Sequence, residues 1–448
     1  MRTNSFHKAW VCRRAGRVVL LLAVLFLFPS VSQADVVTVD CTGGTPGAFT
    51  SITAALNFLP TTSSTEPHTI TVTGTCTENV NILNRQRITI EAPAGQTATI
   101  TSAFPQQSLV VNIAGSRAIT LRRLVIRDGY VGLWITRASE VVVQNSTMEN
   151  NVTQGLRVLE SSNVRLESST ITNNGAQGLR VDPNCYVMVG GNSPSLAVLI
   201  SNNGGDGISA DGAKISINGN TTVESNRSVA IRMTGGRLIV NGNQGENIFR
   251  NNGNGILLGS MSASFTGQNT IQNNAVTGVQ LVAGNATFNQ FVLPDGTFRV
   301  TTIEGHGTSG VTIANTSQLS LSGHHIIRNN GSAPVSSNWA GVRVFNNSML
   351  SLGNGVEITG NTGPGILADL HASLLITNPV TITGNSEEGI RLTLLAGANF
   401  LVSTLLPSPS LPPNVISSIT CDSSSVLAGD LTGIGTIDCK NIETGKKK

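Results

Sequence analysis

Charged and aromatic side chains are scarce in this 448-residue chain. Only 12% of the residues are Asp, Glu, Lys or Arg, and 4% are Phe, Trp or Tyr. The formal charge of +3 comes from residues 1–34, which hold five Arg or Lys and no carboxylate, so the rest is near −2. The basic balance therefore does not predict nucleic-acid binding. So few Tyr and Trp residues also count against a sugar-processing cleft, which usually needs aromatic platforms.

The first 34 residues are typical of a secretory signal peptide, with cleavage expected before Asp35. Basic residues precede the apolar run Val18–Phe28, and the small-residue site Ser32-Gln33-Ala34 follows it. We expect a secreted or periplasmic protein without a transmembrane segment in the mature chain. The later apolar stretch Leu392–Leu406 contains Thr, Gly and Asn, so we expect a last structural coil there rather than a membrane span.

Five cysteines remain after the expected cleavage, and export permits disulfides between them. Proximity in the sequence favours Cys41 with Cys76 and Cys421 with Cys439. Cys185 is then the odd residue. No His or Asn signature of a catalytic thiol accompanies it, so we expect a half-buried loop thiol.

The chain has 48 glycines and abundant Asn, Ser and Thr, and a repeat organises them. The pattern I-x-N-N-x-x-x-G-[IL] occurs, for example, at Ile171–Leu179 (ITNNGAQGL) and Ile200–Ile208 (ISNNGGDGI). Its period is 22 to 24 residues, with longer intervals explained by insertions. Apolar residues alternate with polar ones beside each turn, and no segment of the repeat has a helical period. Such a repeat predicts an all-β fold, a single-stranded right-handed parallel β-helix of about 11 or more coils.

The second Asn of the pattern marks each coil. We expect this residue to adopt a left-handed conformation, and its side-chain amide to form a ladder with the same amide one coil away. The marker falls at Asp128, Asn151, Asn174, Asn203, Asn226, Asn252, Asn274, His306, Asn330, Asn361 and Asn385.

Both ends of such a stack need covers, because open strand edges invite pairing with other chains. Phe49–Leu59 is expected to form an amphipathic capping helix that begins at Ser51 or Thr50. At the other end, the Pro-rich stretch Pro407–Pro413 precedes a loop from Cys421 to Cys439, which we expect to be a disulfide-tied lid. We therefore divide the chain into 1–34, an N-terminal cap and first coils (35–100), the repeats (101–406) and a C-terminal cap and tail (407–448).

The mature chain resembles the right-handed parallel β-helix superfamily, which includes pectate lyases, polygalacturonases, pectin methylesterases and mannuronan epimerases. The N-N-x-x-x-G-I turns carry this resemblance, and FTSITAALNFLP followed by ITVTGTCTENVNI looks like the entry of pectin methylesterase-like proteins. The resemblance is architectural and matches no specific enzyme family. It implies export and an acidic polysaccharide as the ligand class, but the fold alone does not assign a reaction.

The histidines do not form a convincing site. Gly305-His306-Gly307 resembles a polygalacturonase motif, but the acidic motifs that accompany it in that family are missing, so His306 is expected to replace the marker Asn. His324-His325 lacks further ligands at metal-binding spacing, and we expect it and His371 to be solvated turn residues. We identify no cofactor. Calcium is conceivable, although no calcium-binding array is present.

The best candidate site follows from stacking the strands that come after each Gly-Ile. One outward column then contains three arginines close together, and the next outward column contains Asp182 and Asp211 with backbones about 4.8 Å apart. A separation of about 5 Å suits retaining glycosidases, whereas the arginines could neutralise a uronate. Solvated ion pairs are the simpler interpretation. The substrate-binding candidates are Tyr130, Trp134, Arg157, Arg180, Asp182, Asp211 and Arg232.

Three functions stay open at this point. We favour an exported protein that binds polysaccharide or other surface molecules, because the regular repeat lacks the charged insertions of a typical active site. The alternative is a lyase, hydrolase or epimerase acting on an acidic polysaccharide, with Arg157, Arg180, Asp182 and Asp211 as its site. The third is a structural or adhesive rod. A monomer is the default oligomeric state.

Overall fold

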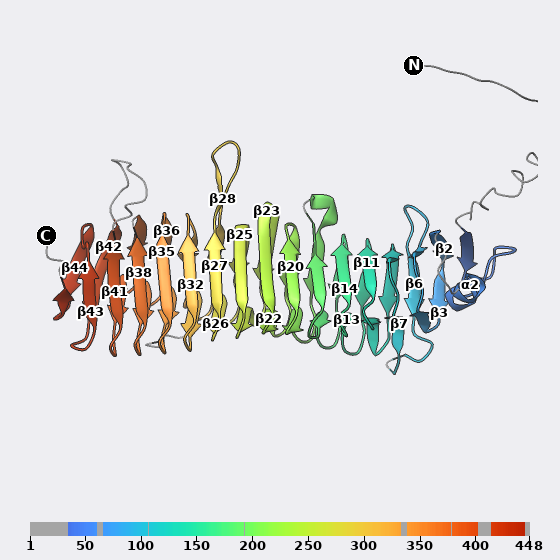
Figure 1. Ribbon diagram of the computed structural model, residues 1–448, viewed down its shortest axis with the longest axis horizontal. Coiled ribbons are helices and arrows are strands. Elements are labelled where there is room, and N and C mark those ends of the chain that lie inside the picture. The colour runs from blue at the N-terminus through green and yellow to red at the C-terminus, as the bar shows by residue number, and fades with distance from the viewer. Residues whose placement is uncertain are drawn as a thin grey trace, which may run out of the picture.

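The computed structural model describes residues 35–60, 66–105, 107–191, 193–332, 338–377, 379–401 and 414–443. The expected signal peptide, the stretch Pro407–Pro413 and the tail Lys446–Lys448 lie outside these residues. Within them, 43 strands join into one parallel network, and only the hairpin strands β28 (Phe291–Val292) and β29 (Phe298–Arg299) pair antiparallel. The structure is a parallel β-helix, as predicted from the repeat (Figure 1).

Each coil contributes one strand to each of three parallel sheets. The first sheet consists of β4 (Val80–Leu83), β7 (Leu109–Ala114), β10 (Val131–Thr136), β13 (Leu156–Val158), β16 (Leu179–Val181), β19 (Ile208–Asp211), β22 (Val229–Thr234), β24 (Asn254–Gly259), β26 (Val279–Val282), β31 (Val311–Ala314), β34 (Val342–Val344), β37 (Ile366–Ala368), β40 (Ile390–Leu392) and the end of β42 (Val415–Cys421).

The second sheet follows the first along every coil. It consists of β1 (Val36–Asp40), β2 (His68–Thr73), β5 (Ile88–Glu91), β8 (Ile119–Arg122), β11 (Glu140–Gln144), β14 (Asn163–Glu167), β17 (Tyr186–Val189), β20 (Lys214–Asn218), the starts of β23 (Arg237–Arg250) and β25 (Ser262–Gln272), β27 (Asn285–Asn289), β32 (Gln318–Ser322), β35 (Met349–Gly353), β38 (Ser373–Thr377), β41 (Gly397–Leu401), β43 (Val426–Gly429) and β45 (Ile442–Glu443).

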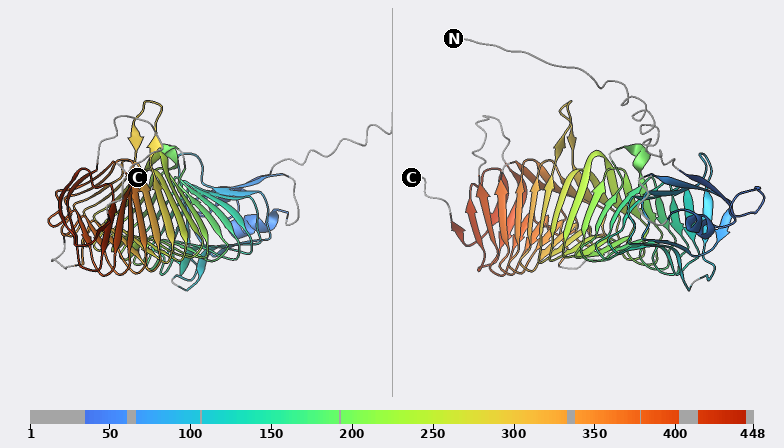
Figure 2. Two further views of the ribbon diagram at one scale, coloured as in Figure 1. Left: turned by 60° about the vertical axis from the view of Figure 1, so that its left-hand side comes forward. Right: turned by 45° about the vertical axis from the view of Figure 1, so that its right-hand side comes forward.

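The third sheet completes each coil. It consists of β3 (Thr75–Thr77), β6 (Ala98–Thr101), β9 (Leu124–Arg127), β12 (Thr147–Glu149), β15 (Thr170–Thr172), β18 (Val198–Ser201), β21 (Thr221–Glu224), the ends of β23 and β25, β30 (Thr301–Glu304), β33 (Ile326–Arg328), β36 (Val356–Thr359), β39 (Val380–Thr383), the start of β42 and β44 (Ile434–Asp438). The turned views in Figure 2 show the coils nested into one elongated rod.

The longer repeat intervals correspond to insertions, as the sequence predicted. The interval between Asn174 and Asn203 contains a short 3-10 helix, Pro194–Leu196. The interval between Asn274 and His306 contains the β28–β29 hairpin, which stands out from the rod (Figures 1 and 2). A shift in strand register between Gly242 and Asn247 lengthens the coil between Asn226 and Asn252. The 3-10 helix and the hairpin therefore lie between strands, whereas the extra residues of β23 lie within a strand and shift its register with β25.

Apolar side chains stack inside the rod because alternate strand residues point inward. Leu156, Val158, Leu179 and Val181 are fully buried, whereas the intervening Arg157 and Arg180 are half-buried on the outside. Some interior stacks use aromatic rings, such as Phe265 on Phe288 with ring centroids 4.2 Å apart. The core therefore runs continuously along the described coils.

The Asn ladder exists. Asn203 Nδ2 donates to Asn226 Oδ1 at 2.9 Å, and Asn226 Nδ2 donates to Asn252 Oδ1 at 3.1 Å. Each Oδ1 also accepts a backbone N–H from the preceding coil, as Asn226 Oδ1 does from Asn203. The same side-chain bond links consecutive members at Asn151, Asn174, Asn203, Asn226, Asn252 and Asn274, and again at Asn330, Asn361 and Asn385.

The left-handed backbone conformation that we expected at the marker residue occurs instead at the residue before it, so this expectation was wrong. The left-handed residue is the first Asn of the pair, with φ of 54° at Asn150, 55° at Asn173 and 55° at Asn202. The marker at Asp128 was wrong for the same reason, because strand register aligns Asp128, with φ of 62°, with Asn150. Gly129 takes the ladder position there, and its N–H donates to Asn151 Oδ1. In each Asn-Asn pair, the first Asn therefore adopts the left-handed turn conformation and the second forms the ladder hydrogen bonds.

His306 replaces Asn in the ladder, as expected. Its Nδ1 accepts the Asn274 N–H at 3.2 Å, and its Nε2 lies 3.1 Å from the Ile271 carbonyl oxygen. The expectation for His325 was wrong, because this side chain is buried and its Nδ1 accepts the Thr301 N–H. The neighbouring His324 is exposed. Burial lowers the pKa of both His306 and His325 to about 4.

Both predicted disulfides form, and each lies near one end of the rod. Helix α2 (Ile52–Phe58) caps the N-terminal end, beginning at Ser51, whose Oγ accepts the Ala54 N–H at 3.1 Å. At the other end parallel pairing continues through β42, β43, β44 and β45, so the segment between Cys421 and Cys439 extends the stack rather than forming a separate loop.

Candidate binding face

The outward column of the first sheet has the register that the sequence predicted. Trp134 pairs with Arg157, Arg157 with Arg180, Arg180 with Ser209, and Ser209 with Arg232. We call the outward side of the first sheet from β10 to β37 the arginine face. Its central column continues through Leu257, Gln280, Thr312, Arg343 and Leu367.

Trp134, Arg157, Asp182 and Arg180 form one connected cluster on this face. The Arg157 guanidinium carbon lies 4.7 Å from the centre of the Trp134 ring. Arg157 Nη2 binds Asp182 Oδ2 at 3.0 Å, and Arg180 Nε binds Asp182 Oδ1 at 3.1 Å. Arg180 Nη1 also donates to Ser209 Oγ at 2.9 Å. One carboxylate thus holds two guanidinium groups, and the cluster keeps one net positive charge.

The ion-paired side chains of this cluster remain partly accessible to solvent. The side chains of Arg157 and Arg180 are 33% and 30% exposed, and that of Asp182 is 19% exposed. Among the described residues, no hydrogen-bond partner is assigned to Arg157 Nη1 or Arg180 Nη2. A planar guanidinium has five N–H donors. Both arginines can therefore donate to a ligand without leaving Asp182.

Two of the predicted residues lie apart from the cluster. Arg232 binds Asp206 in the preceding turn at 2.8 Å, and Asp206 also accepts the Val229 N–H. Asp211 is exposed, and within the described part of the chain its carboxylate has no ion pair or side-chain hydrogen bond. Asp182 and Asp211 thus occupy unlike environments, since both oxygens of Asp182 already accept from arginines.

Tyr130 also lies apart from Trp134. It is in the turn before β10, about 13 Å of extended strand from Trp134, and its side chain is 46% exposed. Its carbonyl oxygen accepts the Thr153 hydroxyl, which anchors the backbone of this turn. The aromatic part of the cluster is therefore Trp134 alone.

A cleft of about 410 Å³ opens beside Trp134, toward the N-terminal end of the rod. The sequence analysis missed most of its lining. Apolar and polar side chains both line the cleft, and its residues are Leu83, Leu109, Asn112, Ala114, Trp134, Thr136, Arg137, Leu159 and Glu160. Extending the outward column of Trp134 toward the N-terminus would have predicted part of this lining. The strand register aligns Asn81 and Asn112 with Trp134 in that column.

Charged groups of both signs stand at the edge of this cleft. Glu160 Oε2 accepts the Thr136 hydroxyl at 2.6 Å, which positions the carboxylate next to Thr136 in the lining of the cleft. Arg137 is exposed in a left-handed turn and has no ion pair within the described ranges. Opposed charges beside an aromatic ring provide both donors and acceptors for a polar ligand.

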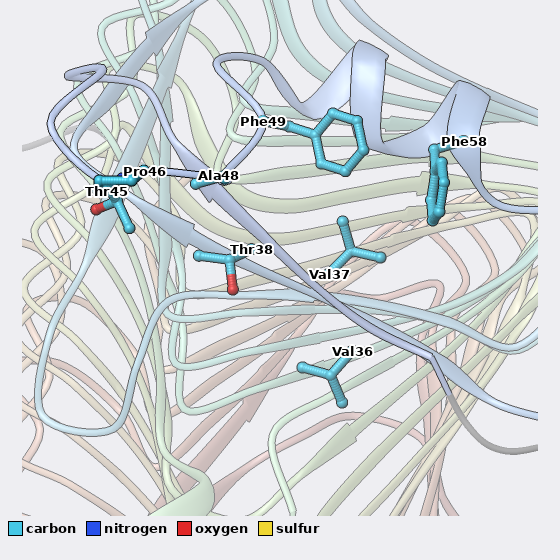
Figure 3. Close-up of a pocket in the computed structure, with 9 residues that line it drawn as sticks. Val36, Val37, Thr38, Thr45, Pro46, Ala48, Phe49 and Phe58 are labelled. Atoms are coloured by element: carbon cyan, nitrogen blue, oxygen red, sulfur yellow. The ribbon is translucent and has the colours of Figure 1, made fainter.

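Two further cavities, each of about 330 Å³, are less suited to a polar ligand chain. The first lies at the N-terminal cap, where Val36, Val37, Phe49 and Phe58 line it (Figure 3). It contains no charged side chain. The second lies over the third sheet and includes Glu224 and Arg250, which bind each other at 2.6 Å.

One group of potential metal ligands occurs in the described ranges, at Cys41, Cys76 and Glu78. The two cysteines form a disulfide, so neither has a thiolate to offer. The Glu78 carboxylate accepts the N–H groups of Ile52 and Thr53 at 2.6 and 3.0 Å, at the start of helix α2. The two cysteines therefore form a covalent bond and Glu78 binds the N-terminus of helix α2, so this group is not arranged as a metal site.

Cys185 was expected to be half-buried, but its side chain is fully buried. Register places it one coil after Ser162, in a column that also contains Ser116 and Ser139. Burial raises the pKa of the thiol. Cys185 is therefore part of the interior stack and is unsuited to act as a nucleophile.

Comparison with known proteins agrees with this fold. A family model described as the right-handed β-helix region matches residues 68–193. The match covers part of the chain, and the strand pairing gives the same parallel β-helix fold along the described coils. Among the described residues no helix is long and apolar enough to cross a membrane. No curated protein sequence matches it significantly.

Several solved structures are similar in fold. A pectate lyase has 12% identity and a TM-score of 0.37, covering 69% of this chain and 83% of the lyase. A mannuronan C-5 epimerase A-module from Azotobacter vinelandii has 12% identity and a TM-score of 0.36, covering 78% and 91%. Tailspike protein 3 of bacteriophage CBA120 has 10% identity and a TM-score of 0.33, covering 84% and 55%.

Proposed function

We propose that this protein binds polysaccharide on the arginine face, beside Trp134. The observation that carries the proposal is the Arg157 guanidinium, which lies on the Trp134 ring at 4.7 Å and is fixed by Asp182 next to an open cleft. Aromatic rings provide flat apolar contact area, and a fixed guanidinium donates hydrogen bonds in one plane. A sugar ring presents an apolar C–H face and hydroxyl groups at its edge, so it is complementary to both.

We favour binding over catalysis because both carboxylate oxygens of Asp182 already accept hydrogen bonds from arginines. A general base, acid or nucleophile needs a carboxyl oxygen free to reach the reacting atom. Asp182 uses one oxygen for Arg157 and the other for Arg180.

We also propose that the protein is exported. Two disulfides, Cys41–Cys76 and Cys421–Cys439, support this, because such bonds persist in oxidising compartments. Cleavage before Asp35 belongs to the same proposal. Mass spectrometry of the protein isolated from its host would test it by giving the mature N-terminus.

The binding experiment uses a panel of acidic and neutral polysaccharides, with affinity electrophoresis for binding and reducing-end and unsaturated-product assays for turnover. We expect retardation by at least one polymer without product formation. Trp134→Ala and Arg157→Gln should each weaken the affinity about tenfold or more, which corresponds to about 1.4 kcal/mol.

Arg328→Gln is the matched control for Arg157→Gln. Arg328 forms a similar partly exposed ion pair, with Glu304 at 2.7 Å, but it lies on the third sheet. We expect Arg328→Gln to leave the affinity unchanged. Equal losses in Arg157→Gln and Arg328→Gln would contradict a specific site, and turnover of any polymer would replace the binding proposal with an enzymatic one.

A further inference from the structure

A second cluster of the same chemistry lies on the arginine face. The Arg343 guanidinium carbon lies 4.5 Å from the centre of the Phe345 ring, and Arg343 Nη2 lies 3.4 Å from Asp369 Oδ2. As at Arg157, an arginine thus lies on an aromatic ring and binds an aspartate of the following coil. Phe345 directly follows β34, the strand that contains Arg343, whereas Trp134 lies in the coil before that of Arg157.

The two clusters are in register. Seven consecutive parallel pairings connect Arg157 to Arg343 along the central column. At about 4.8 Å per coil, the two guanidinium groups are therefore roughly 34 Å apart along the rod. Asp182 and Asp369 likewise share the neighbouring outward column, each one residue beyond the strand of its coil.

Two buried polar atoms of the second cluster have no hydrogen-bond partner among the described residues. Asp369 is 7% exposed, and one of these atoms is its Oδ1. Arg343 Nε is also buried without a partner. Asp182 differs, since both of its oxygens are bound. Unpaired buried polar atoms are costly. The Arg343 side chain is 24% exposed, so its guanidinium can donate to a ligand hydroxyl at the surface.

Within the described residues, the β28–β29 hairpin does not cross the part of the arginine face that lies between the two clusters. The β28–β29 hairpin connects the second sheet to the third, and in Figure 1 it leaves the rod at the edge opposite to the labels of β13, β22 and β26. The intervening column residues include Gln280 and Thr312, which are half-buried and whose uncharged polar side chains suit a ligand that passes over them.

We infer that the two clusters are separate subsites for one extended polysaccharide chain, so that the ligand is a polymer that spans roughly 34 Å rather than a short oligosaccharide. This inference rests on the proposed function. A chain that reaches both clusters binds the second one intramolecularly, which raises the overall affinity above that of either subsite.

The test uses polygalacturonate and dextran fractions graded by length, as an acidic and a neutral probe. We expect the wild-type affinity for the bound polymer to rise at least tenfold once the chain is long enough to reach both clusters. Arg343→Gln should abolish this rise and leave the binding of shorter chains at Trp134 unchanged. Phe345→Leu serves as a second variant that keeps the Arg343–Asp369 ion pair, and thermal unfolding monitors folding.

The outcomes separate this inference from the proposed function. If Arg157→Gln weakens binding but the rise with chain length is absent, or survives both Arg343→Gln and Phe345→Leu, the second subsite is wrong and the first stands. If neither probe binds at any length, and the wider panel also fails, the proposed function itself is wrong. Arg328→Gln is again the control, with an unchanged length dependence expected.

Discussion

The Asn ladder and the arginine face are both polar columns repeated along the rod, but they differ in burial and in what their members bind. Asn203, Asn226 and Asn252 are buried, identical and bonded to one another. Arg157 and Arg180 are partly exposed, vary from coil to coil and bind a carboxylate from the next column. The ladder therefore satisfies the backbone at the turns, whereas the arginines of the face remain partly exposed to solvent.

The largest effect should come from interrupting the ladder. Asn226→Leu removes an acceptor for the Asn203 N–H and amide and a donor to Asn252 and to the Ile200 carbonyl. Because these groups stay buried without partners, we expect a loss of about 3 to 5 kcal/mol in stability, measured by guanidinium unfolding.

Asn202→Gly is the matched control, since Asn202 is the exposed left-handed residue of the same turn. Glycine accepts this conformation readily, so the expected loss is below about 1 kcal/mol. Similar losses in the two variants would remove the distinction between the turn residue and the ladder residue.

Acid should weaken the interior columns at their two histidines. His306 and His325 have a pKa of about 4 in the folded chain because of burial, below the ordinary 6.5. The folded state thus binds protons less readily than the unfolded state. Stability is complete above about pH 6.5 and falls toward pH 4, by roughly 3 kcal/mol per histidine.

His306→Asn should remove the share of this acid sensitivity that belongs to His306, because Asn is the residue that the ladder uses elsewhere. Unfolding curves at pH 7.5 and 4.5 measure the difference between wild type and variant. An identical fall in stability for the two proteins would show that His306 is not the titrating group.

Much of this architecture was predictable from the repeat, because strand alternation and turn spacing are local properties. The period fixed the coils, and the alignment after Gly-Ile gave the register of Arg157, Arg180 and Arg343. The position of the left-handed residue was missed because both residues of Asn-Asn tolerate that conformation. Only the ladder hydrogen bonds, which are contacts between coils, distinguish the two.

The candidate site was less predictable, because side-chain reach decides it. Arg232 and Arg157 share a column, yet Arg232 binds Asp206 from the turn of the previous coil. Leu109 and Asn112 of the cleft lie in coils before the first Asn-Asn turn, so the repeat did not align them. His325 belongs to a second buried polar column, which also contains Asn269 and Thr301. No repeated sequence motif indicates this column, so the burial of His325 was not predicted.

A substitution on the face should affect ligand binding more than stability. Asp182→Asn removes the charge that fixes Arg157 and Arg180, but all three side chains are partly exposed. We expect a stability loss of no more than about 1 kcal/mol. Affinity for the polymer should fall about tenfold or more, because the guanidinium groups lose their common anchor. A large stability loss with unchanged affinity would place Asp182 with the ladder rather than with a binding site.

The smallest effect is expected for Cys185→Ser, at a position where a cysteine follows a column of serines. Ser139 Oγ accepts the Ser116 N–H, and Ser162 Oγ accepts the Ser139 N–H, each at 3.1 Å. Cys185 receives the Ser162 N–H in the same way. Cys185→Ser continues the column, so its stability should differ from wild type by less than about 1 kcal/mol, whereas Cys185→Val leaves the Ser162 N–H unpaired and should cost about 1 to 3 kcal/mol. Equal unfolding midpoints for the Ser and Val variants would show that this column contributes packing alone.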